Sequence, residues 1–369
     1  MNSLWMLLLP VAAASGWLAS IRHRKRSVTF ASDYYLGLRH LFNEEPDKAI
    51  DVFIDLLSVD KETIDTHLAL GTLFRNRGEV NRAIRIHDNL VARSELSKKQ
   101  RLYALFELAH DYMHAGVLDR AEELFLEVLN LDNKSAGANK ALMTIYEQQK
   151  DWHKAIKFAK KLPKLQRRSM TAAIANYYCE LGDPEAALEI DKNCVRASIL
   201  LGNKQVQCGQ YKNAIFSYKN ILSQDADFIA EIIDSLAICY ANLRNEKAFD
   251  KYLYECLKKA PRISILIAIS ENIRKTEGDF AAIDFMTEQL SRCPSLHGLL
   301  YITELYVNNS DITTRKRLQS LLDTMHILLR AKPAYRCSRC GFSAKTLYWH
   351  CPSCREWNSL KPIYGLDGN

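Results

Sequence analysis

Apolar and polar positions alternate with a helical spacing along this chain, and the same short pattern returns over most of its length. Stretches such as VNRAIRIHDNL, LDRAEELFLEVL and YKNAIFSYKNIL place apolar residues every three or four positions, which predicts amphipathic helices with one buried face. Each stretch carries an alanine where a second helix must approach closely. These alanines are Ala49, Ala83, Ala121, Ala155, Ala187, Ala214, Ala248 and Ala282. Their successive spacings are 34, 38, 34, 32, 27, 34 and 34, which indicates a repeated unit.

A period of about 34 residues with two helices per unit is typical of tetratricopeptide repeats. Glycines stand five residues before four of the alanines, at Gly78, Gly116, Gly182 and Gly209, where the turn between two helices is expected. We therefore predict an all-α fold in which residues 30–331 form a tetratricopeptide solenoid of about eight units plus closing helices. The shortest of the spacings predicts a shortened helix in the fifth unit.

A solenoid of this kind presents a concave surface lined by the first helix of each unit. Counting from the alanines, we expect Arg75, His110, Lys140 and Asn203 to face this groove and to contact a partner. The alternative is that each is an ordinary solvated helix residue. His87 falls at a packing position, so we expect a core histidine there and no ligand role. The chain contains no G-x-x-x-x-G-K-[ST], H-E-x-x-H or G-x-S-x-G motif.

The N-terminal segment differs from the repeats because Leu4–Ile21 contains no charged residue. Eighteen helical residues span about 27 Å, close to the hydrocarbon thickness of a bilayer. The basic run Arg22–Arg26 follows directly, which places the C-terminal side in the cytoplasm by the positive-inside rule. We predict a transmembrane signal anchor at residues 1–21 and a basic juxtamembrane linker at 22–29. A signal peptide cleaved after Ala12-Ala13-Ala14 and an interfacial helix are the alternatives.

Composition and charge narrow the classes of partner. The chain has 369 residues, of which 25% are charged, and its net charge is +7. This mild excess sits partly in short clusters, so it does not indicate a nucleic-acid-binding protein. Six of the ten cysteines lie singly along the repeats, at 179, 194, 208, 239, 256 and 293, as small apolar residues would. This usage is typical of a reducing compartment.

The other four cysteines define a separate module at residues 332–369. The stretch CSRCGFSAKTLYWHCPSC contains two C-x-x-C pairs, formed by Cys337 with Cys340 and by Cys351 with Cys354. Two such turns supply the four sulfurs of a tetrahedral site for one iron or zinc ion. Because four thiolates leave no open coordination position, we expect a structural rather than a catalytic metal. His350 is a weaker candidate ligand. We also expect Phe342, Tyr348, Trp349 and Trp357 to pack around the site.

The chain combines a predicted N-terminal anchor, a tetratricopeptide solenoid and a C-terminal four-cysteine module, in this order. With this arrangement it closely resembles the lipopolysaccharide assembly protein B family of Gram-negative bacteria. The resemblance is carried by LLLPVAAASGW, by GTLFRNRGEVNRAIRIHDNL and by YRCSRCGFSAKTLYWHCPSCREWNSLKPIYGLDG. The chain departs from the family in the fifth unit, which is shorter here. It implies a single-pass inner-membrane protein whose bulk lies on the cytoplasmic side and whose metal ligands are Cys337, Cys340, Cys351 and Cys354. The family's rubredoxin-like ribbon corresponds to the C-terminal module.

The resemblance further implies a non-enzymatic adaptor that modulates lipopolysaccharide levels. Its expected partners are a membrane-bound AAA+ protease, the committed lipid A pathway deacetylase that this protease degrades, other lipopolysaccharide assembly proteins and a second copy of the chain. Two alternatives are a membrane scaffold for biosynthetic enzymes without control of proteolysis, and an iron–sulfur redox protein.

Overall fold

A computed structural model of the chain describes residues 35–40, 48, 52, 64–94 and 96–366. The predicted anchor, the basic linker and Ala49 therefore lie outside the described residues. Within the part that is described, no helix is both long enough and apolar enough to cross a lipid bilayer.

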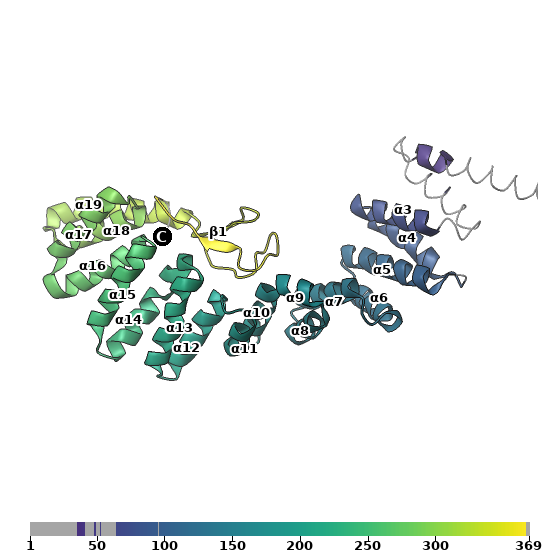
Figure 1. Ribbon diagram of the computed structural model, residues 1–369. Helices are drawn as coiled ribbons and strands as arrows, with labels where there is room; N and C mark the ends of the chain where they lie inside the picture. Colours follow the sequence, from purple (N-terminus) through teal and green to yellow (C-terminus); the bar gives the residue numbers. More distant parts are fainter. Residues whose placement is uncertain (1–34, 41–47, 49–51, 53–63, 95, 367–369) are drawn as a thin grey trace, which may run out of the picture. The chain divides into compact units, whose positions relative to one another are not determined.

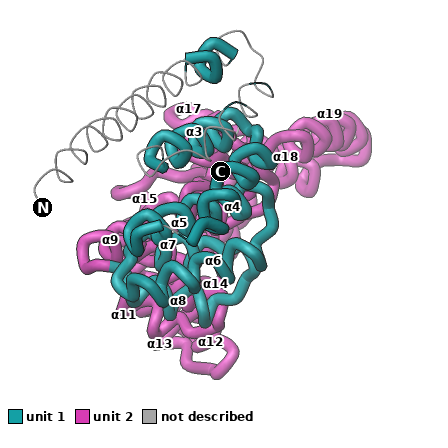
Figure 2. Tube along the Cα trace, turned by 90° about the vertical axis from the view of Figure 1, so that its right-hand side faces the viewer, with its two compact units in different colours: residues 1–162 teal, residues 163–369 magenta. Residues whose placement is uncertain are grey.

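The chain divides into two compact units, residues 1–162 and residues 163–369, which Figure 2 colours separately. The described part of the first unit contains the helices α3 (Ile64–Asn76), α4 (Val80–Val91), α5 (Lys98–His114), α6 (Leu118–Leu131), α7 (Ala136–Gln148) and α8 (Trp152–Lys161). Each helix packs against the next in the chain.

The second unit continues the helical pairs and then ends in three short strands (Figure 1). Its helices are α9 (Lys164–Ser169), α10 (Thr171–Glu180), α11 (Pro184–Ile190), α12 (Val195–Gln207), α13 (Tyr211–Gln224), the 3₁₀ helix η2 (Ala226–Ile232), α14 (Ile233–Asn242), α15 (Glu246–Lys259), α16 (Ile263–Glu277), α17 (Asp279–Arg292), α18 (Leu296–Asn309) and α19 (Ile312–Ala331). Its strands are β1 (Tyr335–Cys337), β2 (Ser343–Ala344) and β3 (Leu360–Pro362). The predicted class, a tetratricopeptide-type solenoid followed by a small four-cysteine ribbon, is confirmed.

Small residues mark the places where two helices touch. The alanines at 83, 121, 155, 187, 214 and 282 are fully buried. A Cβ added to Gly71 would lie 2.4 Å from Nε2 of His87, and one added to Gly202 would lie 2.4 Å from the ring of Tyr218. The glycines of the first helix thus admit a large ring from the second helix. Ala248 is only half-buried, because Phe249 fills the core position in its helix.

The turns between paired helices need a left-handed residue. Gly116 adopts a φ of 78° there, which costs glycine little. Lys150 adopts a φ of 59° at the equivalent position before α8. The repeat geometry therefore holds even where the sequence lacks glycine.

Two places in the second unit depart from the regular repeat. The helix α11 has only seven residues, as the short spacing predicted, and its partner α10 has ten. The residues before α14 form the 3₁₀ helix η2 instead of a first α-helical turn. The side chain of Asp225 accepts a hydrogen bond from the backbone N–H of Asp227 at 3.1 Å and so starts η2.

A buried polar network joins three helices of the first unit. The carboxylate of Asp111 on α5 is completely buried. It lies 2.8 Å from Nη1 of Arg75 on α3 and 2.5 Å from Nδ1 of His87 on α4. The expected core role of His87 is confirmed, since the ring is fully buried and its Nε2 lies 3.3 Å from the carbonyl oxygen of Leu68.

Candidate metal centre

The C-terminal ribbon is an antiparallel sheet with the strand order β2-β1-β3. In β1, Tyr335 pairs with Ala344 of β2 on one side and with Pro362 of β3 on the other. The strand β1 ends at Cys337, so the turn that follows it carries the first cysteine pair. The sheet thereby fixes where that pair lies.

Both cysteine pairs sit in the same kind of turn. In the first, the N–H of Gly341 donates to the carbonyl oxygen of Cys337 at 3.1 Å, and Gly341 has a φ of 78°. In the second, the N–H of Arg355 donates to the carbonyl oxygen of Cys351 at 2.8 Å, and Arg355 has a φ of 55°. The sequence signals the first turn by its glycine, whereas in the second an arginine adopts the same left-handed conformation.

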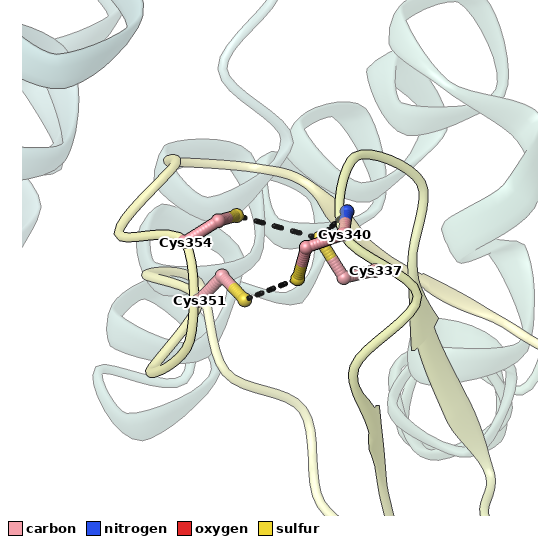
Figure 3. A group of neighbouring side chains, drawn as sticks. All are labelled: Cys337, Cys340, Cys351 and Cys354. Carbon is pink, nitrogen blue, oxygen red and sulfur yellow. Dashed lines mark hydrogen bonds between the residues drawn. The ribbon is translucent and has the colours of Figure 1, made fainter.

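The four predicted ligands converge on one point, as Figure 3 shows. Their sulfur atoms all lie within 4.8 Å of one another. The sulfurs of Cys337 and Cys354 are 3.7 Å apart, as are those of Cys340 and Cys351. A metal with metal–sulfur bonds of about 2.3 Å needs tetrahedral sulfurs about 3.8 Å apart, so the spacing fits one ion. It is far longer than a disulfide bond of about 2.05 Å.

Hydrogen bonds prepare Cys337 to act as a thiolate ligand. Its sulfur accepts from the N–H of Arg339 at 3.4 Å, the N–H of Cys340 at 3.5 Å and the hydroxyl of Ser359 at 3.3 Å. Burial raises the pKa of Cys337, but these donors outweigh burial and lower the pKa to about 6. In Cys354, desolvation and the neighbouring thiols raise the pKa to about 12. The hydrogen-bond donors around Cys337 therefore favour its thiolate form, which is the form that binds a metal.

The aromatic residues of the ribbon bind the solenoid rather than enclosing the sulfurs. Trp349 stacks on Phe228 of η2, with ring centroids 5.2 Å apart and planes at 25°. Trp357 packs edge-on against Tyr177 of α10, with centroids 5.9 Å apart. Of the four aromatics expected around the site, only Phe342 packs in the cluster of the buried cysteines. Tyr348 is 46% exposed.

His350 takes no part in the cysteine cluster. Its ring stacks on Trp357 with centroids 4.4 Å apart, and its Nε2 lies 2.8 Å from the carbonyl oxygen of Arg355. Among the described residues, the four cysteines are the only group of three or more side chains placed to hold a metal.

Polar contacts complete the attachment of the ribbon. The hydroxyl of Tyr335 donates to Glu231 at 2.6 Å, and Lys361 forms an ion pair with Asp225. The hydroxyl of Tyr364 donates to the carbonyl oxygen of Asp227. The side-chain amide of Asn176 donates to the side-chain oxygen of Asn358 at 3.1 Å. We call the solenoid residues in these aromatic and polar contacts the ribbon-binding surface: Asn176, Tyr177, Asp225, Asp227, Phe228 and Glu231. Sequence reasoning missed this surface, although the acidic run DADFIAE stands out beside a basic ribbon.

The four residues predicted to line the groove have different environments. Arg75 is largely buried in ion pairs with Glu107 and Asp111, and His110 packs edge-on between Phe106 and Phe125. Burial and the charge of Arg75 lower the pKa of His110.

The other two make fewer contacts. Lys140 is exposed on α7. The side-chain oxygen of Asn203, on α12 of the second unit, accepts a hydrogen bond of 2.6 Å from the hydroxyl of Tyr218. None of these contacts joins the four residues into one site.

The fold and the cysteine site together define a tetratricopeptide-repeat protein that carries a rubredoxin-type metal ribbon. Residues 335–362 match the rubredoxin metal binding domain family, and residues 66–99 match a tetratricopeptide repeat family. Lipopolysaccharide assembly protein B of Escherichia coli strain K12 is 37% identical over 388 residues, and the protein of the same name from Haemophilus influenzae is 33% identical over 399 residues. Both alignments cover 100% of this chain and 100% of the relative. The chain belongs to the lipopolysaccharide assembly protein B family.

Solved structures show a more distant likeness. The structure of Naa15/Naa10 bound to HypK-THB has a TM-score of 0.46 at 13% identity, covering 82% of this chain and 51% of that chain. YrrB, described as a TPR protein with an unusual peptide-binding site, has a TM-score of 0.29 at 18% identity, covering 45% of this chain and 90% of that chain. Neither adds to the functional argument.

Proposed function

We propose that this chain is a non-enzymatic adaptor of the inner membrane that modulates lipopolysaccharide levels. It promotes degradation of the committed lipid A pathway deacetylase by a membrane-bound AAA+ protease. The observation that carries the proposal is the full-length similarity to relatives named lipopolysaccharide assembly protein B, at 37% and 33% identity. The closed set of four cysteine ligands, fastened to a repeat scaffold by the ribbon-binding surface, supports its non-enzymatic part. Such a set holds a structural ion, because no coordination position is left for a substrate.

The donor set fits either zinc or iron. When bound, the ion would link the two turns through Cys337, Cys340, Cys351 and Cys354, and this link would stabilise a module too small to fold on apolar burial alone. Elemental analysis of the purified protein identifies the metal. A redox role requires iron with a visible absorption that bleaches reversibly on reduction. Retained function in a zinc-substituted protein would exclude that role.

Attachment to the membrane is part of the proposal. The apolar run at residues 1–21 and the basic run after it support an anchor with the repeats on the cytoplasmic side. An anchor raises the local concentration of the repeats near membrane partners. Deletion of residues 1–21 is therefore expected to weaken function at native expression, and full activity of that form would contradict the role of the anchor.

The deciding experiment measures the half-life of the deacetylase in cells that lack this protein. We expect a longer half-life, which wild-type protein restores and Cys340→Ser does not. Cys208→Ser is the matched control, because Cys208 is an exposed cysteine on the repeats outside the metal site. An unchanged half-life in the deletion strain would overturn the adaptor proposal.

A scaffold that assembles biosynthetic enzymes is the second candidate function, favoured by the word "assembly" in the names of the relatives. Crosslinking with and without the ribbon separates the two candidates. The adaptor is expected to capture both the protease and the deacetylase, whereas a scaffold captures biosynthetic enzymes and leaves proteolysis unchanged.

A further inference from the structure

The positive charge of the chain is concentrated in one short stretch. Residues 150–168 contain eight basic residues and one acidic residue, Asp151, so their net charge is +7. The basic residues are Lys150, Lys154, Lys157, Lys160, Lys161, Lys164, Arg167 and Arg168. The whole chain also has a net charge of +7, so all the other residues together carry no net charge. Charge of one sign on a short segment indicates a partner of the opposite sign.

Much of this charge lies on one face of the helix α8 in the first unit. The exposed side chains of α8 are one histidine and four lysines: His153, Lys154, Lys157, Lys160 and Lys161. At about 100° per residue, these five positions fall within a sector of about 120° around the helix. The opposite side of α8 is buried in the repeats. We call the five exposed residues the basic face of α8.

Packing within the repeats does not explain the basic face. Lys157 lies three positions after Lys154 and four before Lys161, and like charges at these spacings destabilise a helix. The helix dipole favours Lys160 and Lys161 in the last turn, but it does not favour Lys157 in the middle of the helix. The face therefore has a cost in stability that a partner outside the fold would offset.

The lysines of the basic face are only partly matched by carboxylates. Lys154 forms an ion pair with Asp151 at 3.2 Å. Lys157 and Lys161 form no ion pair with any residue that the structure describes. Nζ of Lys161 instead lies 4.8 Å from the ring centroid of Phe158. These two charges can meet an external anion without breaking a contact with a carboxylate.

The preceding outer helix of the same unit, α6, shows the usual arrangement. Its carboxylates have basic partners within the unit: Glu123 lies 2.7 Å from Arg120, and Glu127 lies 3.6 Å from Arg101. The excess of one sign on α8 is therefore not a general property of the outer helices.

We propose that the basic face of α8 rests on an anionic phospholipid surface. Lysines near such a surface are attracted by its headgroup charge, and no apolar group has to enter the bilayer. In the sequence of the same unit, the basic run Arg22–Arg26 follows an apolar segment and indicates the same anionic leaflet. A protein partner fits less well, because protein interfaces are depleted in lysine and enriched in arginine and aromatic residues. The exposed residues of α8 include no arginine, tyrosine, phenylalanine or tryptophan.

The inference rests on the proposed membrane attachment and adds a second contact to it, which holds whatever protein the repeats bind. Each lysine close to an anionic membrane strengthens binding about fivefold. Removing the charges of Lys154 and Lys161 is therefore expected to weaken the contact about 25-fold.

The test measures the acylation rate of single lysines in the full-length protein in lipid nanodiscs. An uncharged acylating reagent is applied in discs of phosphatidylcholine alone and in discs with added phosphatidylglycerol, and mass spectrometry gives the rate for each lysine. We expect Lys157 to react at least about fivefold more slowly in the anionic discs, and we expect added salt to remove the difference. Lys98 and Lys99 are exposed on α5 of the same unit and should react equally fast in both kinds of disc.

Three double variants separate charge on α8 from charge in general. Lys154→Gln with Lys161→Gln should restore the reaction rate of Lys157 in anionic discs to its rate in neutral discs. Lys154→Arg with Lys161→Arg keeps the charge and should keep the protection. Lys98→Gln with Lys99→Gln is the matched control, because it removes the same charge from α5 and should leave Lys157 protected. Circular dichroism checks that each variant is folded.

Equal reaction rates of Lys157 in neutral and anionic discs would overturn the proposal, as would equal slowing of Lys98 and Lys99. Protection that appears only after an acidic protein is added would also overturn it and would identify a protein-binding face.

The N-terminal anchor is reported separately by incorporation into neutral discs. Suppose the protein does not enter these discs but is retained by phosphatidylglycerol vesicles, and the variant Lys154→Gln with Lys161→Gln is not retained. This result would contradict the anchor and still support the contact at α8. Absence of both incorporation and retention would overturn both.

Discussion

The stacking of Trp349 on Phe228 allows the attachment of the ribbon to be tested without touching a metal ligand. Replacing Trp349 by alanine removes the stacked pair, whose centroids are 5.2 Å apart, and uncovers part of the apolar core around Phe228. All four cysteines keep their positions in the ribbon. We expect the ribbon to detach from the solenoid more often and to release its metal faster.

The magnitude follows from the area that is lost. A half-buried tryptophan covers about 100 Å² of apolar surface, which at about 25 cal/mol per Å² gives about 2.5 kcal/mol. The aromatic pair adds about 0.5–1 kcal/mol. A loss of about 3 kcal/mol raises the population of the detached ribbon on the order of 100-fold.

The assay is the rate of metal transfer from the native protein to a chromophoric chelator. Tyr348→Ala is the matched control, because Tyr348 is the preceding residue and is 46% exposed. Its release rate should stay within about twofold of the wild-type rate, since exposed substitutions change stability by less than about 0.5 kcal/mol. If Trp349→Ala releases metal as slowly as Tyr348→Ala, the aromatic contact does not hold the ribbon and the reasoning fails.

Three further predictions concern the metal and the repeats. Cys340→Ser should lower the bound metal and unfold the ribbon, as chelation should in the wild-type protein, and elemental analysis with circular dichroism checks both. Gly71→Ala should destabilise the first unit by about 1–3 kcal/mol in denaturant unfolding, because its Cβ would lie 2.4 Å from a buried histidine ring. Asp111→Asn should cost about 3 kcal/mol, because it removes the completely buried negative charge that faces both Arg75 and His87 and leaves Arg75 paired only with the partly exposed Glu107. Glu107→Gln, on a side chain that is 23% exposed, should cost less than about 1 kcal/mol; an equal cost would contradict the role of burial.

The parts of this fold that could be predicted from the sequence are those encoded by local spacing. The regular recurrence of the alanines predicted the helical pairs, and the two C-x-x-C pairs predicted the site at which the sulfurs converge. The ribbon-binding surface could not be predicted, because its contacts join residues far apart in the chain. Tyr335 and Glu231 are 104 positions apart, and Asn176 and Asn358 are 182 positions apart. No periodic pattern relates such positions.

The irregular places in the repeats coincide with the contacts of the ribbon. The shortened α10–α11 pair supplies Tyr177, which packs against Trp357. The 3₁₀ helix η2 supplies Phe228 and the acidic groups around it, which bind Trp349 and Lys361. In a regular repeat, the residues at these positions would pack against the next helix. Here Tyr177 and Phe228 pack against the aromatic side chains of the ribbon instead. The 3₁₀ helix η2 is therefore better explained as an adaptation to the ribbon than as a degraded repeat. Sequence changes that turn η2 into a regular α-helical turn should weaken ribbon attachment while leaving the helical content unchanged or higher.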